Sequence, residues 1–267
     1  MRIFLVILFA LSYFSGNMLA KDLSKQSGVR KIKDVVVYDD PQFYVAFPSV
    51  VKSGDDYLVA FRRAPNRVML GEPYPTHTDL NSYLVMVRSK DGETWTKNPF
   101  GGSQDPCLLK LRDGTLLCTS YGWTHLREDA IAKLKQPVYH EGGWVAMGGY
   151  IMRSFDNGKT WEGPIYPTAV KDGIYKDPMG NPLSAYNRGA LYEGKSGRIF
   201  WVVAAMDDYP LTKTSNHLLY SDDKGLTWQY ASIVAAHEKF IFNEASVYET
   251  PKGDIVAFIR TENPETR

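Results

Sequence analysis

Two charged residues near the end of the sequence, Glu244 and Arg260, are of types and at a spacing that could do chemistry together. Glu244 opens one segment of strand character, and Arg260 closes the next, after a turn at Lys252-Gly253. If these segments pair as antiparallel strands, both charges lie at the same end of the pair. A carboxylate there can serve as a base, and a guanidinium matches a carboxylate ligand in bidentate fashion. A structural ion pair at the strand ends is the alternative.

A second candidate lies in the polar loop Thr76-His77-Thr78-Asp79. A carboxyl in a closed pocket can have its pKa raised and then act as a proton donor. An Asp in a loop is more often only a turn residue, and His77 is a rival for the proton-transfer role.

Other chemistries find little support in the sequence. The scattered histidines, which show no metal-ligand spacing, are His125, His140, His217 and His237. The sequence also lacks a phosphate-binding loop, a dinucleotide-binding pattern and a nucleophile elbow. We therefore expect no metal and no cofactor.

The elements that must position these residues show internal repetition. Three segments share the pattern Ser-x-Asp-x-Gly-x-Thr-Trp, the first of them one residue shorter: 89–95, 154–161 and 221–228. Each follows a segment of strand character. We predict hairpin turns in which the Asp accepts backbone N–H bonds, the Gly supplies a positive φ and the Trp packs over the turn.

Four further segments interleave with these turns and are predicted as strand, turn, strand: 47–62, 105–123, 188–206 and 243–260. A hairpin followed by a Ser-x-Asp turn gives four short antiparallel strands per unit, which is the pattern of a propeller blade. Asp105 and Arg188 hold corresponding strand-start positions, so both could line a central cavity, as ligand contacts or as salt bridges. Tyr121 and Trp123 either stack on a ligand or pack between blades.

The three repeated turns are Asp boxes, and their alternation with hairpins resembles the sialidase (neuraminidase) superfamily of six-bladed β-propellers. The resemblance covers residues 35–267. It implies an all-β propeller of sialidase type with about four blades in this chain, so we expect the sequence to be truncated at its C-terminus. Asp boxes lie at the periphery of such propellers, and no catalytic role is expected for Asp91, Asp156 or Asp223.

The resemblance also implies a mechanism. Sialidases are retaining glycosidases in which a Tyr, activated by a Glu, is the nucleophile, an Asp is the acid/base, and three Arg residues hold the substrate carboxylate. It assigns the acid/base role to Asp79, the activating role to Glu244 and one carboxylate-binding role to Arg260. The nucleophilic Tyr and the third Arg would lie beyond residue 267.

One position departs from the family pattern. Sialidases usually carry Arg-Ile-Pro at the start of the first blade, and the aligned residues here are Ala46-Phe47-Pro48. Arg62 or Arg63, at the far end of the same hairpin, could substitute, because Arg62 holds in the first unit the position of Arg260 in the fourth. If neither substitutes, another acidic sugar or a neutral sugar becomes the more plausible substrate.

The rest of the sequence bounds cellular location and partners. With 267 residues and a net charge of +1, the chain lacks the basic footprint of a nucleic-acid-binding protein. Residues 1–20 are predicted to be a signal peptide and 21–267 the propeller domain, so we expect an exported, periplasmic or extracellular protein without a membrane span after cleavage. The helical spacing of 126–135 suggests a loop insertion at 124–148. Export permits a disulfide between Cys107 and Cys118, although two buried thiols are at least as plausible.

The sequence thus predicts an exported exo-glycosidase that removes terminal sialic acid or a similar acidic sugar from a glycan or glycoconjugate. Two alternatives stay open: a non-catalytic propeller that binds glycan or protein, and a glycosidase for a non-sialic sugar. Ala46 favours the non-catalytic alternative, and the Glu244–Arg260 combination opposes it.

Overall fold

The computed structural model describes residues 31–73, 79, 81–98, 100, 104–170, 173–184 and 189–263. Val37–Arg267 form one compact unit, distinct from Met1–Val36, and the fold described below is that of the larger unit. The predicted signal peptide lies outside the described residues. In the part of the chain that the structure describes, no helix is long and apolar enough to cross a bilayer.

The larger unit consists mainly of β-strands. They are β1 (Phe43–Ser53), β2 (Asp56–Pro65), β3 (Tyr83–Ser89), β4 (Thr96–Asn98), β5 (Cys107–Lys110), β6 (Leu116–His125), β7 (His140–Glu141), β8 (Trp144–Ser154), β9 (Glu162–Ile165), β10 (Tyr192–Glu193), β11 (Ile199–Met206), β12 (Thr214–Ser221), β13 (Gln229–Ala235), β14 (Ile241–Glu249) and β15 (Ile255–Glu262). Two short helical segments, η1 (Arg67–Leu70) and α2 (Glu128–Ile131), lie in the connections.

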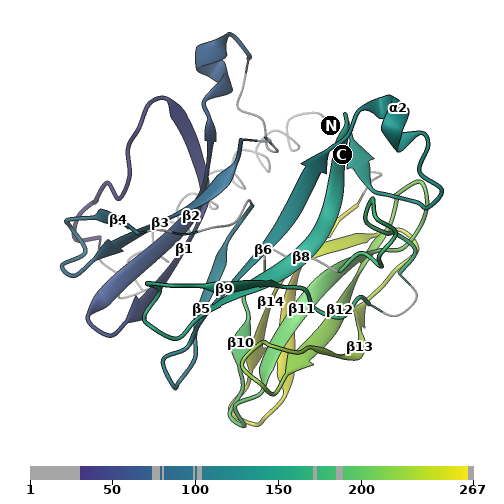
Figure 1. Cartoon of the computed structure of the whole chain (residues 1–267). Helices are drawn as coiled ribbons and strands as arrows, with labels where there is room; N and C mark the ends of the chain where they lie inside the picture. Colours follow the sequence, from purple (N-terminus) through teal and green to yellow (C-terminus); the bar gives the residue numbers. More distant parts are fainter. Residues whose placement is uncertain are drawn as a thin grey trace, which may run out of the picture. The chain divides into compact units, whose positions relative to one another are not determined.

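These strands form four antiparallel sheets (Figure 1). Sheet 1 has the order β1-β2-β3-β4, and sheet 3 has the order β10-β11-β12-β13. Sheet 2 has the order β5-β6-β8, with β7 and β9 both paired to β8, and sheet 4 consists of β14 and β15. Sheets 1 and 3 each consist of four consecutive antiparallel strands, which confirms the predicted blade pattern. In sheet 2, β6 pairs with β8 instead of with its neighbour in the sequence, β7.

The apolar core lies between successive sheets. Leu116 and Leu117 on β6 are adjacent in sequence and therefore point to opposite faces of sheet 2. Both are fully buried: Leu116 packs in a cluster with Leu58 and Met86 of sheet 1, and Leu117 in a cluster with Trp201 of sheet 3. The cluster between sheets 3 and 4 contains Val202, Ala245 and Val247. Each sheet is thus stabilised by its neighbours in the sequence.

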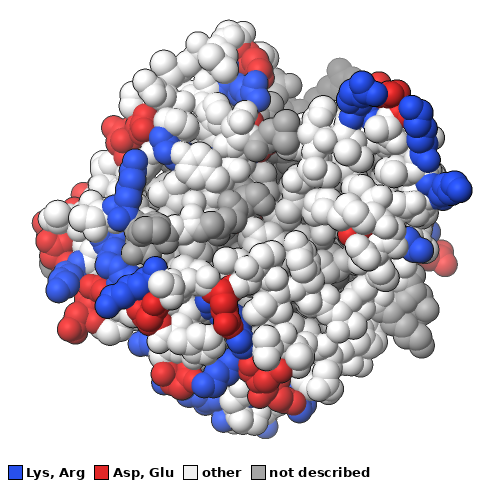
Figure 2. All heavy atoms as spheres, in the orientation of Figure 1, with Lys and Arg blue, Asp and Glu red and all other residues white. Residues whose placement is uncertain are grey.

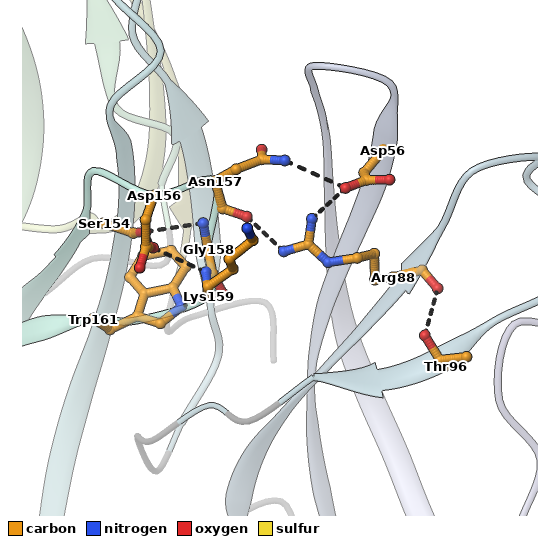
Figure 3. A network of polar contacts seen from close by, with 9 residues as sticks. All are labelled: Asp56, Arg88, Thr96, Ser154, Asp156, Asn157, Gly158, Lys159 and Trp161. Atoms are coloured by element: carbon orange, nitrogen blue, oxygen red, sulfur yellow. Dashed lines mark hydrogen bonds and ion pairs between the residues drawn. The ribbon is translucent and has the colours of Figure 1, made fainter.

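The Asp boxes form the predicted hairpin turns (Figure 3). In the second box, Ser154 Oγ donates to Asp156 Oδ1 at 2.9 Å and accepts the Gly158 N–H at 2.9 Å. Asp156 Oδ1 also accepts the Thr160 N–H at 2.8 Å, and Trp161 Nε1 donates to the Gly158 carbonyl at 3.2 Å. Equivalent bonds in the third box join Ser221, Asp223, Gly225, Thr227 and Trp228.

The first box is one residue shorter for a reason visible in the backbone. In the two longer boxes a non-glycine residue with positive φ precedes the glycine: Asn157 at 63° and Lys224 at 58°. The first box passes directly from Asp91 to Gly92, whose φ is 74°. Asp91 Oδ1 still accepts backbone N–H bonds from the two residues that follow Gly92, so the turn keeps its central acceptor.

Arginines join each of the first two sheets to the Asp box of the next (Figure 3). Arg88, at the end of β3, forms a 2.5 Å ion pair with Asp56 and donates to the Asn157 carbonyl of sheet 2 at 2.5 Å. Arg153, in the corresponding place on β8, donates to the carbonyls of Asp223 and Lys224 in sheet 3 at 3.2 and 3.3 Å. The repeat in the sequence is therefore also a repeat of contacts between sheets.

The segment predicted as a loop insertion is partly strand. β6 continues to His125, and β8 begins at Trp144, which pairs with it. The predicted helix at 126–135 is reduced to the four residues of α2, whose Ile131 packs with Val138 and Val145 in a small separate cluster. The apolar spacing of 126–135 predicted a longer helix than the structure contains. A short helix is stabilised mainly by the residues that pack against it, and the spacing alone does not reveal these.

Both cysteines lie on the β5–β6 hairpin, Cys107 on β5 and Cys118 on β6, as the sequence suggested. No disulfide joins Cys107 and Cys118 in this structure. Cys118 is fully buried, and burial raises the pKa of its thiol well above the usual range. A thiol in this state is a small apolar core group rather than a reactive nucleophile.

Candidate functional site

The two ends of each sheet differ in content. At the Asp-box end lie the Asp boxes and the turns between first and second strands, and Gly54, Asp113 and Lys224 from three of these turns line an open cavity of about 570 Å³. At the opposite end, called here the strand-start end, the first strand of each sheet begins and the second ends. Because the strands are antiparallel, Arg62 on β2 pairs there with Ala46 on β1.

Glu244 and Arg260 are brought together at the strand-start end of sheet 4. A register shift between Phe242 and Ala245 places Glu244 in an irregular part of β14. Glu244 Oε1 lies 3.6 Å from Arg260 Nη1, and Arg260 Nη2 forms a second ion pair with Glu262 Oε1 at 2.9 Å. The side chains of Glu244 and Arg260 are 42% and 53% exposed in this chain.

Arg62 lies near the end of β2, opposite the start of β1. Its direct cross-strand partner is Ala46, and opposed residues of antiparallel strands share one face of the sheet. The guanidinium is fully buried, lies over the rings of Tyr44 and Phe47, and donates to Gln104 Oε1 at 3.1 Å. Arg62 therefore shares a face of sheet 1 with Ala46 and is covered by aromatic rings.

Arg63 has a different environment, because alternate strand residues point to opposite faces. Its guanidinium lies 3.3 Å from the ring centroid of Phe43, contacts the Tyr83 hydroxyl and forms a 3.2 Å ion pair with Asp40. The structure thus separates the two arginines that the sequence left as alternatives. Arg63 contacts Asp40, which precedes β1, and Phe43, the first residue of β1. Arg62 contacts Gln104 and thus points toward sheet 2.

Asp105 occupies the strand-start position of sheet 2. It is buried, has a positive φ of 31° immediately before Pro106, and its Oδ2 accepts the Tyr121 hydroxyl at 2.8 Å. The preceding residue, Gln104, is the buried partner of Arg62, and sequence analysis missed it because a lone Gln carries no pattern. Arg188, the corresponding residue in the third unit, lies outside the described residues.

Trp123 belongs to a row of aromatic rings rather than standing alone. Its ring lies 6.4 Å from that of Tyr121 and 5.7 Å from that of Tyr139. Tyr121, Trp123 and Met206 line a cavity of about 20 Å³, which is the size of one water molecule and too small for a sugar. These contacts match the packing alternative for Tyr121 and Trp123.

Asp79 forms the tightest charged contact of the candidate residues. Its carboxylate is fully buried, and Arg67 Nε donates to its Oδ2 at 2.6 Å while the Asn81 backbone N–H donates to its Oδ1 at 2.9 Å. Burial by itself raises the pKa of Asp79, but the hydrogen bonds from Arg67 and Asn81 outweigh it and lower that pKa below the usual range. Arg67 was missed by sequence analysis, and the rival His77 lies outside the described residues.

The described residues show no group of three His, Cys, Asp or Glu side chains placed to hold a metal ion. On the face shown in Figure 2, basic and acidic side chains are mixed along much of the margin. Such mixing gives no single-sign surface of the kind that nucleic acid requires.

Comparison with solved structures places this fold among known proteins. A crystal structure of a protein of unknown function from Dyadobacter fermentans is 59% identical, with a TM-score of 0.82, and the similarity covers 88% of this chain and 67% of that one. A sialidase from Trypanosoma rangeli is 17% identical with a TM-score of 0.52, over 87% of this chain and 36% of that one. A mutant of the NanB sialidase from Streptococcus pneumoniae is 14% identical with a TM-score of 0.50, over 89% and 52%.

No family model and no curated protein match the chain. The chain spans about two thirds of the Dyadobacter protein and about a third to a half of the two sialidases. The sialidase likeness shows the fold, which is that of a sialidase-type β-propeller with about four blades in this chain. At 59% identity, the chain belongs to the same family as the Dyadobacter fermentans protein.

Proposed function

We propose that the protein is a glycoside hydrolase that removes a terminal acidic sugar, such as sialic acid, from glycans. The observation that carries this proposal is the half-exposed pair of Glu244 and Arg260, 3.6 Å apart at the ends of adjacent strands. It joins a base and a carboxylate-binding group at the strand-start end, the end at which Asp79 follows β2. The sialidase-type fold supports the same conclusion.

The proposed roles follow from the chemistry of each group. Glu244 accepts a proton from a nucleophilic Tyr or water, and Arg260 binds the sugar carboxylate through its guanidinium. Asp79 protonates the leaving oxygen and later accepts a proton from water, as in other retaining glycosidases. Arg62 contributes positive charge from the position opposite Ala46, and Asp105 and Arg188 remain candidates for sugar contacts. We further propose that the protein acts after export.

A non-catalytic glycan-binding propeller is the second candidate. It is favoured by one observation, the ion pair in which Arg67 keeps the Asp79 carboxylate ionised. An acid catalyst must carry a proton before it can donate one. In a binding protein the same pair would simply fix the loop after η1.

The test uses the full-length protein and 4-methylumbelliferyl glycosides of sialic acid, of a hexuronic acid and of a neutral hexose. Wild type is compared with Asp79→Asn, Glu244→Gln and the matched control Glu238→Gln, an exposed residue near the start of sheet 4. We expect release of fluorophore from an acidic glycoside, lost in the first two variants and retained in the control. Binding of the sugars without turnover, in protein shown to be folded by circular dichroism, would replace the hydrolase with the glycan-binding alternative.

A further inference from the structure

The contact between Arg67 and Asp79 sets a condition on any acid chemistry at this site. The Asp79 carboxylate accepts from a guanidinium at 2.6 Å and from a backbone N–H at 2.9 Å, and both bonds favour its charged form. The Asp79 side chain is fully buried while Arg67 is bound to it. Protonation of Asp79 therefore requires that Arg67 first find another acceptor.

A second carboxylate already lies beside the same guanidinium. Glu72 Oε1 is 3.4 Å from Arg67 Nη1, and the Glu72 side chain is 42% exposed. The Arg67 side chain is 30% exposed, and its Nε is bound to the buried Asp79. The Arg67 guanidinium thus contacts the buried carboxylate of Asp79 and remains partly exposed, so a second anion can approach it from solvent.

We propose that Arg67 is a positioning residue that holds Asp79 as a carboxylate while the site is empty and shifts its hydrogen bonds to an anionic group of the ligand when a sugar binds. This proposal rests on the proposed function. The chemistry of the guanidinium fork selects a sugar that carries a carboxylate near the bond to be cleaved. A neutral sugar offers no such acceptor and leaves Arg67 on Asp79.

The shift completes the proton balance of the reaction. Once Arg67 has moved, the enclosed Asp79 carboxylate takes a proton from solvent, because burial then favours the neutral acid. Asp79 passes this proton to the glycosidic oxygen as the bond to the sugar carbon breaks and the oxygen keeps the bonding electron pair. The sugar carbon receives an electron pair from the nucleophile and finally from water, whose proton returns to Asp79.

Among the described residues, few groups influence the protonation of Asp79. Arg67 and Asn81 act directly on the Asp79 carboxyl, and Glu72 acts on Arg67. Arg67 and Glu72 belong to η1 and the residues after it, whereas Asn81 lies just before β3. Substitution of Arg67 alone should therefore change the protonation of Asp79 without altering another charge on it.

The kinetic test compares the pH profiles of kcat/KM and kcat on the acidic glycoside for wild type, Arg67→Gln, Arg67→Lys and the control Arg127→Gln. Because kcat/KM reports the free enzyme and kcat the bound one, we expect the alkaline limb of kcat/KM in wild type to lie at least about one pH unit below that of kcat. In R67Q the two limbs should coincide, R67K should restore part of the separation, and R127Q should match wild type. Coincident limbs in wild type would overturn the proposal.

A second measurement does not depend on turnover. The Asp79 carboxyl is titrated by ¹³C NMR in the full-length protein, alone and with saturating N-acetylneuraminic acid or galactose. We expect the acidic sugar, and the R67Q change without sugar, each to raise the pKa of Asp79, and galactose to leave it in place. An unchanged pKa with the acidic sugar, or an equal shift with galactose, would refute the role of Arg67. A protein that hydrolyses nothing still gives this titration, so the two proposals fail separately.

Discussion

The Asp-box end and the strand-start end belong to the same sheets, yet they use charge in different ways. At the Asp-box end, Asp156 accepts bonds from the side chain and backbone of Thr160, which lower its pKa to about 2. Asp113 has its pKa lowered to about 2 by Lys224 and by the backbone of Thr115. These carboxylates hold turns in shape and are fully engaged in doing so.

At the strand-start end the contacts are not repeated from blade to blade, although Arg62 and Arg260 hold corresponding positions in their sheets. Glu244 faces Arg260 in sheet 4, Arg62 faces Gln104 between sheets 1 and 2, and Asp79 is bound by Arg67. None of the three boxes supplies a residue to these contacts. The Asp boxes serve the fold, and the candidate groups lie at the opposite end of the sheets.

The largest effect should come from exchanging one carboxylate for an amide at each end. We expect Asp79→Asn to reduce kcat/KM on the acidic glycoside by about 10²–10⁴-fold, the range for loss of a general acid. Asp91→Asn, the same exchange in the first Asp box, should leave kcat/KM of the folded protein unchanged. Steady-state kinetics on purified, folded protein measure kcat/KM for both variants. Equal losses would contradict the assignment of the chemistry to the strand-start end.

The next effect concerns the contacts that join the sheets. Arg88→Ala removes an ion pair in which Asp56 is only 14% exposed, and it also removes the bond to the Asn157 carbonyl. We expect a loss of about 2–3 kcal/mol in the free energy of unfolding, the scale for bonds to charged groups. Arg127→Ala, which breaks the exposed pair with Asp129, should cost less than about 1 kcal/mol. Urea denaturation measures both, and similar losses would contradict the assignment of Arg88 to the fold.

A smaller effect separates backbone strain from packing in two boxes. Gly158 has a φ of 75°, and a Cβ there would lie 3.1 Å from Leu58 and 3.3 Å from Leu116. Gly92 has nearly the same φ, with open space around it. We expect Gly92→Ala to cost about 1 kcal/mol for strain alone and Gly158→Ala about 2 kcal/mol. Thermal unfolding of the two variants compares them, and an equal cost would show that the leucines move aside.

The smallest effect is on acid stability. Because the pKa of Asp156 in the folded protein is lowered to about 2 from its ordinary value of 3.8, its contribution to stability is present above about pH 4 and is lost as the pH falls toward 2. Asp156→Asn should therefore flatten the fall in melting temperature over that range. Asp55→Asn, in the exposed turn between β1 and β2, serves as the control. Parallel pH profiles for wild type and D156N would show that the box bonds persist in the unfolded chain.

The sequence predicted the fold far better than the site. The boxes are visible in the sequence because the side chains of Ser154 and Asp156 and the backbone of Gly158 make the bonds that close the turn, so these residue types recur. The β14–β15 pair was predictable for the same reason, since two alternating segments and a glycine turn determine which ends meet. The roles assigned to Glu244 and Arg260 remain predictions.

Partners that meet through irregular segments could not be foreseen. Arg67 reaches Asp79 across a connection without periodicity, and Gln104 reaches Arg62 from the neighbouring sheet. Strand alternation predicts that Arg62 and Arg63 point to opposite faces, but only the structure shows which of them faces sheet 2. Side-chain partners of this kind depend on where a loop crosses another element, which no local pattern encodes.

The arginines between sheets also bear on how the sequence can change over time. Both Arg88 and Arg153 donate to main-chain oxygens of the next blade, and a main-chain oxygen is present whatever side chain accompanies it. The receiving positions indeed differ, being Asn157 in one blade and Asp223 and Lys224 in the next. We therefore expect the main-chain bonds to survive substitutions on the receiving side as long as the turn keeps its course, although Asn157 would also lose the 3.3 Å bond from its side chain to Asp56. The donating arginine has no such freedom, because its side chain makes the bond.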